Sequence, residues 1–143
     1  MDKDAIKIIE EEVSLFIRRI VITEKRNDML ERSAYVLLRQ LSVAGPAGVK
    51  SLSEQLKLDI STISRQAAAL EQKEYIEKMP NPKDGRSYFY RITNLGIKEL
   101  DDNKERRYDR LSEVLSDWSE EDKLTFGHLL KKYNQTIIEK DKP

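Results

Sequence analysis

A cluster of hydrogen-bonding side chains stands close together between residues 61 and 66. Ser61, Thr62 and Ser64 carry hydroxyl groups that donate and accept, and Arg65 carries a forked guanidinium that fits two acceptors at once. Short hydroxyls and a long arginine are the groups that contact base edges in the major groove of duplex DNA. We place the neighbouring Gln66 with them. The cluster predicts hydrogen-bonded recognition of a nucleic acid.

A helix over residues 59–72 is expected to position these groups. Its apolar residues fall at i, i+4 and i+7 and form one stripe: Ile63, Ala67 and Leu70. Winding at 3.6 residues per turn puts Arg65 nearly opposite this stripe, beside small and hydroxyl-bearing residues. We expect Asp59 to cap the helix, because its carboxylate can accept from the free N–H groups of the first turn.

A charged hairpin over residues 76–93 offers a second contact. Asp84-Gly85 is a tight-turn signal between two β-like runs, and Lys83 and Arg86 flank it. An arginine on a protruding loop suits the narrow, electronegative minor groove. Asp84 precedes Arg86 by two residues and can hold its guanidinium by a charge-assisted hydrogen bond.

The residue types leave other interpretations open. A helix-turn-helix with a hairpin can also serve as a protein-interaction adaptor that docks a partner through the same surface. The aromatic run Tyr88, Phe89 and Tyr90 can stack on single-stranded bases. At strand spacing beside a turn, however, we expect these three rings in the core of the hairpin.

Residues for catalysis or metal binding are not grouped in this sequence. His128 is the only histidine and there is no cysteine, so a zinc site or a Ser-His-Asp arrangement lacks partners at suitable spacing. The acidic pairs at 101–102 and 120–121 fall on a predicted helix surface and a predicted cap. No glycine loop that would cradle a phosphate is present. We therefore expect no enzyme activity, no cofactor and no metal.

The composition bounds the class of protein. With 143 residues, 38% apolar and 36% charged, the chain suits one helix-rich protomer. Its net charge is zero, but residues 49–92 hold eight basic and six acidic groups. The small positive excess therefore falls on the segment predicted to contact nucleic acid. No apolar run is long enough to cross a bilayer and no signal segment opens the chain, so we expect a cytoplasmic protein without a membrane partner.

The flanking segments predict long helices with uncovered apolar stripes. We expect helices over residues 4–24, 29–43, 52–58, 93–117 and 119–138, with caps at Ser51, Thr93 and Ser119 and a short strand at 48–50. A core of about seventy residues cannot cover the stripes of the first and last helices, and burying each large apolar side chain contributes about 1.5–3 kcal/mol. A homodimer in which these helices interlock is the simplest remedy. The two copies of the predicted nucleic-acid-binding segment in this homodimer would contact a pseudo-palindromic duplex with half-sites roughly 10 bp apart.

The run from residue 52 to 96 resembles the winged helix-turn-helix of the MarR family of bacterial transcription regulators. The matching features are STISR at 61–65, Leu70-Glu71, Asp84-Gly85-Arg86 in the wing, and Ile92-Thr93 followed by Gly96. The chain departs from the family pattern at three positions. Glu74 stands where a glycine usually ends the recognition helix, Lys78 stands where an arginine is usual, and Ile92 replaces a leucine.

The resemblance implies a mainly α fold with a small β-hairpin wing. In this fold residues 30–93 form the winged helix-turn-helix, a three-helix core plus wing. Residues 1–28 and 94–143 form long N- and C-terminal dimerisation helices of the same protomer.

For function, the resemblance implies a homodimeric, sequence-specific repressor of transcription. Helix 60–72 would enter the major groove and wing 81–87 the minor groove. We expect DNA contacts from Lys50, Ser61, Thr62, Ser64, Arg65, Gln66, Lys83, Asp84 and Arg86. A small aromatic or anionic effector would release the DNA by binding between the dimerisation helices and the winged domain. Arg18, Tyr35 and Arg39 are residues of the type that can line such a crevice.

Overall fold

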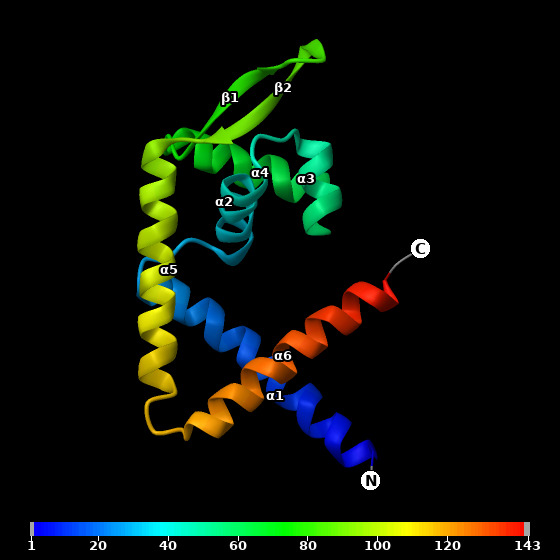
Figure 1. Ribbon diagram of the computed structural model, residues 1–143, viewed down its shortest axis with the longest axis vertical. Coiled ribbons are helices and arrows are strands. Elements are labelled where there is room, and N and C mark those ends of the chain that lie inside the picture. Colours follow the sequence, from blue (N-terminus) through cyan, green and yellow to red (C-terminus); the bar gives the residue numbers. More distant parts are fainter. Residues whose placement is uncertain (1, 142–143) are drawn as a thin grey trace. The chain divides into compact units, whose positions relative to one another are not determined.

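The computed structural model describes residues 2–141, which form helices and one antiparallel hairpin (Figure 1). The elements follow in the order α1 (Asp2–Arg26), α2 (Arg32–Ala44), α3 (Val49–Leu56), α4 (Ile60–Gln72), β1 (Ile76–Asn81), β2 (Asp84–Ile92), α5 (Asn94–Val114) and α6 (Glu120–Lys140). The mainly α class with a hairpin is confirmed. The chain divides into two compact units between Arg106 and Arg107. Among the described residues, no helix has the length and apolarity needed to span a membrane.

The core of the first unit lies where α2, α3, α4 and the base of the hairpin meet. Its fully buried large apolar side chains come from these four elements and from α5: Leu37, Leu38, Leu41, Leu52, Ile63, Leu70, Ile76 and Leu100. The predicted stripe of α4 is therefore confirmed, since Ile63, Ala67 and Leu70 are each at most 2% exposed. Packing of this stripe fixes which face of α4 points outward.

Helix α3 begins three residues earlier than predicted. Its N-cap is Gly48, without a side-chain cap, so Ser51 lies inside the helix and its hydroxyl accepts a hydrogen bond from Gln55 instead. The predicted strand at 48–50 is wrong for the same reason. Only Ala47 joins the sheet, through two backbone hydrogen bonds with Tyr90 of 2.9 and 3.1 Å. The backbone of α3 then ends in the left-handed residue Lys57, with φ of 56°.

Helix α4 starts where predicted but is not capped as predicted. Asp59 occupies the N-cap position with φ of −64° and ψ of 147°, yet its carboxylate makes no capping hydrogen bond. At the other end, Tyr75 N–H donates to the Leu70 carbonyl at 3.0 Å, and Glu74 adopts the left-handed conformation with φ of 64°. Glycine normally fills this position because a Cβ is disfavoured there. Glu74 therefore preserves the helix end at a conformational cost.

The hairpin turns one dipeptide earlier than the Asp84-Gly85 signal predicted. Asn81 pairs with Asp84, so Pro82 and Lys83 form the two-residue loop, and Asp84 begins β2. The Asn81 carboxamide accepts from the Lys83 N–H at 2.9 Å, which closes an Asx turn. The ring of Pro82 fixes a φ that suits such a loop. The turn therefore forms at Pro82-Lys83 rather than at Asp84-Gly85.

A tight joint connects the hairpin to α5. The Thr93 hydroxyl accepts from Gly96 N–H at 3.0 Å, as a cap, and donates to the Glu74 carbonyl at 2.6 Å. A Cβ added to Gly96 would lie 2.0 Å from the Tyr75 carbonyl oxygen. Glycine at position 96 therefore lets the start of α5 approach the segment after α4 more closely than a residue with a Cβ would permit.

Polar contacts attach the α1–α2 connection to the first part of α5. Asn103 is completely buried, and its side-chain oxygen accepts from Leu30 N–H at 3.0 Å while its amide donates to the carbonyl of Glu99. The guanidinium of Arg106 donates to the Asp28 carbonyl at 3.1 Å. The buried bond pairs the Leu30 N–H with a partner inside the protein, and the exposed bond to Asp28 adds a second link between the two segments.

The predicted uncovered stripes are present on α1 and α6, each considered within its own unit. On α1, the exposed apolar residues include Ile6, Ile9, Phe16 and Ile17. On α6, which buries no residue, they include Leu124, Leu129, Tyr133, Ile137 and Ile138. The start of α6 is capped as predicted, because Ser119 accepts from Asp122 N–H at 3.1 Å. Trp118 packs on Phe126 beside this cap, with ring centroids 5.5 Å apart.

Candidate nucleic-acid interface

The outward side of α4 carries most of the predicted base-contacting groups. Ser61, Ser64 and Arg65 are exposed, and Thr62 is half-buried. Ala68 and Ala69 are also exposed, and α4 carries no acidic side chain before Glu71. Because the opposite side packs into the core, these residues share one solvent-facing surface. We call the exposed side chains of Ile60, Ser61, Ser64, Arg65 and Ala68 the reading face.

Gln66 lies on the other side of α4 and does not belong to the reading face. Its side chain is 4% exposed, and its amide donates to the Glu31 carboxylate at 3.1 Å. The position follows from helix geometry, because residue 66 is three after Ile63 and four before Leu70. Proximity in sequence to Arg65 suggested a DNA contact, whereas the helical period places Gln66 against α2.

Ile60 belongs to the reading face although sequence reasoning missed it. It is the first residue of α4 and is 54% exposed. Its helical angle lies close to that of Ala67, so periodicity alone would assign it to the buried stripe. The core does not extend to this end of α4, so the side chain stays in solvent. Residues at the start of a recognition helix are the ones that meet base edges.

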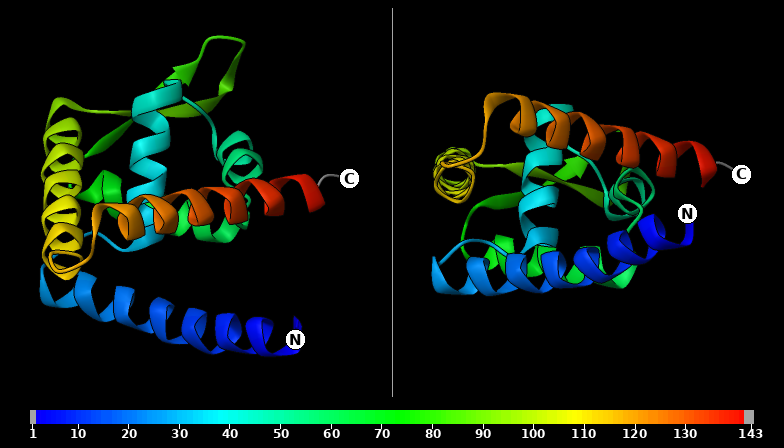
Figure 2. Two further views of the ribbon diagram at one scale, coloured as in Figure 1. Left: turned by 60° about the horizontal axis from the view of Figure 1, so that its bottom comes forward. Right: turned by 90° about the horizontal axis from the view of Figure 1, so that it is seen from below.

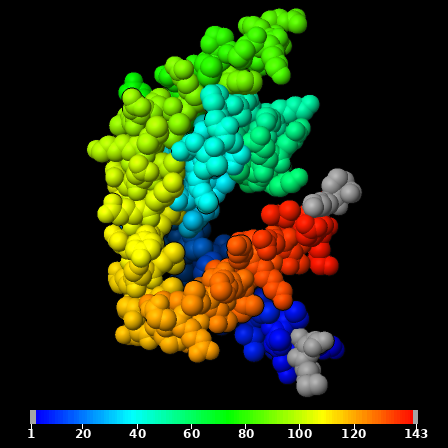
Figure 3. Space-filling view, in the orientation of Figure 1, coloured from blue at the N-terminus to red at the C-terminus, as the bar shows by residue number. Residues whose placement is uncertain are grey.

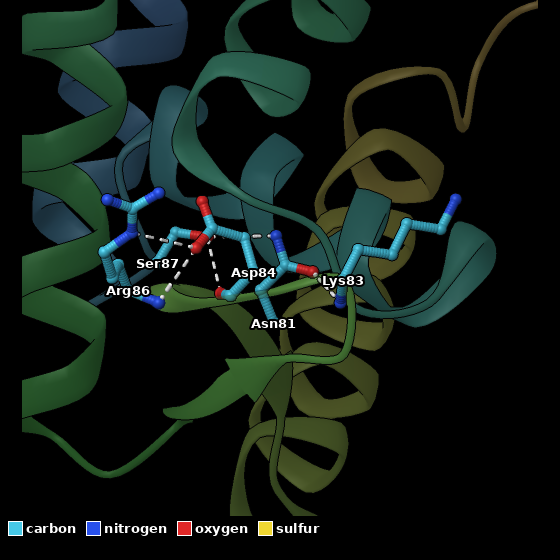
Figure 4. Close-up of polar contacts among 5 residues, drawn as sticks. All are labelled: Asn81, Lys83, Asp84, Arg86 and Ser87. Atoms are coloured by element: carbon cyan, nitrogen blue, oxygen red, sulfur yellow. Dashed lines mark hydrogen bonds and ion pairs between the residues drawn. The ribbon is translucent and has the colours of Figure 1, made fainter.

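The tip of the hairpin presents one arginine almost without cover. The Arg86 side chain is 95% exposed, and its Nε lies 3.6 Å from a carboxylate oxygen of Asp84 (Figure 4). The same oxygen accepts from the Arg86 backbone N–H at 3.0 Å. The expected pairing of Asp84 with Arg86 is therefore present in the structure.

Two residues that sequence reasoning missed shape this tip. The Asn81 amide donates to the Ser87 hydroxyl at 3.0 Å, and that hydroxyl donates to the Asp84 carbonyl at 3.2 Å (Figure 4). Their signal in the sequence is a pair of small hydrogen-bonding residues on either side of a proline loop. Lys83 stands exposed in the loop itself. The tip extends away from the helices of the first unit (Figures 1 and 3).

Lys50 joins the hairpin from the first turn of α3. It is exposed and lines an open pocket of about 570 Å³ between the start of α3 and the hairpin. The hairpin side of this pocket is formed by Asn81, Ser87, Tyr88 and Phe89. The structure therefore brings Lys50 to the side of the molecule that carries the wing, as a phosphate contact requires.

The base of the hairpin holds an aromatic and ionic cluster. Tyr88 and Tyr90 meet edge to face with ring centroids 5.4 Å apart, and the Lys78 ammonium lies 4.6 Å from the Tyr88 centroid. Lys78 Nζ is also 3.7 Å from a carboxylate oxygen of Glu71. Burial, followed by the hydrogen bond with Tyr88, raises the pKa of Tyr90 above its ordinary value. With Tyr90 only 4% exposed, the hairpin-core interpretation is confirmed for this ring.

A cavity of about 350 Å³ lies in the first unit between the α1–α2 connection, the end of α4 and the start of α5. Its lining includes Asp28, Glu31, Lys73, Tyr75 and Glu99. Burial and the neighbouring Glu99 carboxylate raise the pKa of Tyr75 above its ordinary value. The wall thus presents carboxylates beside one ammonium and one phenol.

The three residues considered for an effector crevice do not line this cavity. Tyr35 is buried in the core and packs under the Arg32 guanidinium, which lies 5.9 Å from its ring centroid. Arg18 and Arg39 are exposed. Within the part of the chain that the structure describes, no three His, Cys, Asp or Glu side chains gather into a possible metal site.

Comparison with known proteins agrees with this geometry. The family model described as the MarR family matches residues 30–88. A relative in Bacillus subtilis (strain 168), the uncharacterized HTH-type transcriptional regulator YxaD, is 47% identical over 141 residues, covering 96% of this chain and 99% of that protein.

Solved structures share the fold. Streptococcus pneumoniae FabT, crystallised in complex with DNA, has a TM-score of 0.75 and 18% identity, covering 93% of this chain and 97% of that one. The PcaV transcriptional regulator from Streptomyces coelicolor, solved with its natural ligand, has a TM-score of 0.66 and 21% identity, covering 84% and 89%. With a winged helix-turn-helix core, an outward reading face and a near full-length relative, the chain belongs to the MarR family of DNA-binding transcriptional regulators.

Proposed function

We propose that this protein is a homodimeric repressor that binds a pseudo-palindromic duplex through two copies of the reading face and the wing tip. The observation that carries the proposal is the pairing, on one module, of an outward α4 surface around Arg65 with a protruding, 95% exposed Arg86. In this arrangement α4 enters the major groove, while the wing tip, residues 81–87, reaches the minor groove. FabT, a protein of the same fold, has been crystallised in complex with DNA.

Each exposed group has a role that fits its chemistry. The Arg65 guanidinium suits the two acceptors of guanine, and the hydroxyls of Ser61, Thr62 and Ser64 suit base edges or phosphates. Lys50 and Lys83 contribute phosphate contacts, which position the protein without reading sequence. Asp84 holds the Arg86 side chain at the tip and contacts the duplex only indirectly. Gln66 is left out of the proposed contacts because it is buried against Glu31.

The proposed dimer rests on the exposed apolar stripes. Ile6, Leu124 and Ile138 are 64%, 61% and 62% exposed in the single chain. Apolar surface of this extent on a water-facing helix marks an interaction site. A second copy of the chain is the partner that supplies an equivalent stripe, and two-fold symmetry then matches a pseudo-palindromic site.

The proposed release mechanism uses the cavity of about 350 Å³ beside the end of α4. A ligand there would touch Lys73 and Leu70 near the end of α4, together with Glu99 of α5. PcaV, a protein of the same fold, has been solved with its natural ligand. The carboxylates of the cavity wall accept hydrogen bonds. Among the aromatic or anionic molecules that the family resemblance implies, they therefore favour an effector that donates hydrogen bonds.

Selection of bound duplexes from a random pool tests the proposal. We expect an inverted repeat with half-sites roughly 10 bp apart, and an affinity that falls steeply with salt as counterions are released. The protein should run as a dimer in light scattering at micromolar concentration. A monomer that enriches no sequence would overturn the proposal, and partner binding insensitive to salt would favour the protein-docking alternative.

A further inference from the structure

The outer half of the wing lacks the support that orients most strands. Among the described residues, the backbone bridge nearest the tip that links the hairpin to another segment is Ala47–Tyr90, and all side chains from Pro82 to Tyr88 are exposed. A two-stranded hairpin has little stability by itself. Something other than the hydrophobic core must therefore fix the direction in which Arg86 points.

Lys78 is the side chain that joins three elements at this place. It projects from β1, its Nζ lies 3.7 Å from the Glu71 carboxylate of α4, and the same ammonium lies 4.6 Å from the ring centroid of Tyr88 on β2. In the strand register Lys78 pairs with Tyr90 and Pro80 pairs with Tyr88. The ammonium thus reaches two residue pairs further toward the tip than its own position.

We propose that Lys78 is a positioning residue that sets the direction of the wing relative to the recognition helix and acts on DNA through Arg86. One end of the contact is anchored on α4, whose opposite face is fixed by the core, and the other end holds the ring of Tyr88. Tyr88 stands two residues before the buried Tyr90 and two residues after Arg86. The inference rests on the proposed function, since it concerns how that function places its minor-groove contact.

The charge environment supports an intramolecular role for this ammonium. The carboxylate of Glu71 and the electron-rich face of Tyr88 both attract a cation, and Lys78 is 46% exposed, so it is half withdrawn from solvent. Each contact alone is weak in water. Together the two contacts restrict the direction of the hairpin near Lys78. Arg86 lies eight residues further along the chain, so a small change in that direction produces a large displacement of the Arg86 side chain.

A double-mutant cycle on duplex affinity tests the inference. Arg86→Ala should weaken binding by about tenfold. Lys78→Met, which keeps the length of the side chain without its charge, should weaken binding by about fivefold when Arg86 is present. The same change should have almost no effect in the Arg86→Ala background, because the contact it positions is gone.

Matched variants separate positioning from a direct phosphate contact. Lys78→Arg should restore affinity, since a guanidinium can pair with Glu71 and stack on Tyr88. Tyr88→Leu should reproduce the loss seen with Lys78→Met, whereas Tyr88→Phe, which keeps the ring, should show less. A direct phosphate contact predicts the opposite pattern: equal losses in both Arg86 backgrounds, no effect of Tyr88→Leu, and a salt slope lower by about 0.9. Any of these three results would overturn the inference.

A measurement without DNA keeps this inference distinct from the proposed function. Backbone order parameters for residues 82–87 should be lower in Lys78→Met than in the wild-type protein, moving from near 0.85 toward about 0.6. Unchanged order parameters would overturn the positioning role even if the protein binds DNA. A wild-type protein that binds no duplex but whose wing loosens in Lys78→Met would instead contradict the proposed function alone.

Discussion

The recognition helix and the wing are built on different physical principles. Helix α4 is held by a stripe in which Ile63, Ala67 and Leu70 are at most 2% exposed, and the side chains proposed to contact DNA lie on the opposite face. The outer wing is the green loop that extends past the helices of its own unit in the left view of Figure 2. It has no buried side chain between Pro82 and Tyr88, and hydrogen bonds and an ion pair define its shape (Figure 4). In α4, the side chains that stabilise the fold and those proposed to contact DNA are different residues of one element. In the wing, direction is set by contacts that contribute little to stability.

The largest expected effect is at the joint that both regions share. Gly96→Ala would place a methyl group 2.0 Å from the Tyr75 carbonyl oxygen, a backbone atom that cannot move aside without separating α4 from β2. We expect a loss of about 4 kcal/mol or more in the free energy of unfolding, measured by chemical denaturation at fixed protein concentration. Gly127→Ala on α6 is the matched control, because a Cβ there meets nothing within 4 Å. Equal effects of the two substitutions would refute the close approach.

The two faces of α4 should respond oppositely to truncation. Leu70→Ala removes a side chain that is 2% exposed and should lower the free energy of unfolding by about 2–5 kcal/mol. Arg65→Ala on the outer face should leave stability within about 0.5 kcal/mol but cost about 1–3 kcal/mol of binding at one base position. Denaturation and duplex titration of both variants check this. An Arg65→Ala protein with unchanged affinity and base preference would remove Arg65 from the reading face.

The end of α4 offers a stabilising change. Glu74 has φ of 64°, and replacing it with glycine relieves the left-handed strain while adding chain entropy to the unfolded state. We expect Glu74→Gly to gain about 0.5–1 kcal/mol and to raise the melting temperature by a few degrees. Glu74→Ala keeps the strain and should show no gain. If the alanine variant is stabilised as much as the glycine variant, the gain has another origin.

An expected effect of similar size tests Ile60. An exposed isoleucine at the start of a recognition helix suits the 5-methyl group of thymine. Replacing single thymines of a selected half-site by deoxyuridine, which lacks that methyl, should weaken binding at one position by about 0.8 kcal/mol. The Ile60→Ser protein should be insensitive to the same replacement. A wild-type protein that tolerates deoxyuridine at every position would contradict this contact.

The comparison also explains what could be predicted from the sequence. The stripe of α4 follows from helical periodicity, and the exposed Arg86 follows from its place in a charged hairpin. Periodicity cannot show where a core ends, so Ile60 was missed. Gln66 was placed by adjacency to Arg65, although its helical angle favours the inner face.

Local signals failed where two of them competed. The loop at Pro82-Lys83 displaced the Asp84-Gly85 turn because the Asn81 side chain closes it. Similarly, Ser51 was expected to start α3, but the pairing of Ala47 with Tyr90 lets the helix begin at Val49. The outcome in both places depends on a tertiary or side-chain partner that a short sequence window does not contain.

Asn103 gives the first unit a defined register. Its completely buried carboxamide accepts from a single backbone N–H, that of Leu30, and sliding α5 by one turn would strand both groups away from water. An apolar residue at position 103 would not distinguish this alignment of α5 and the α1–α2 connection from alignments shifted by one turn. The buried hydrogen bond of this amide therefore favours one alignment of α5 against the α1–α2 connection over the adjacent ones.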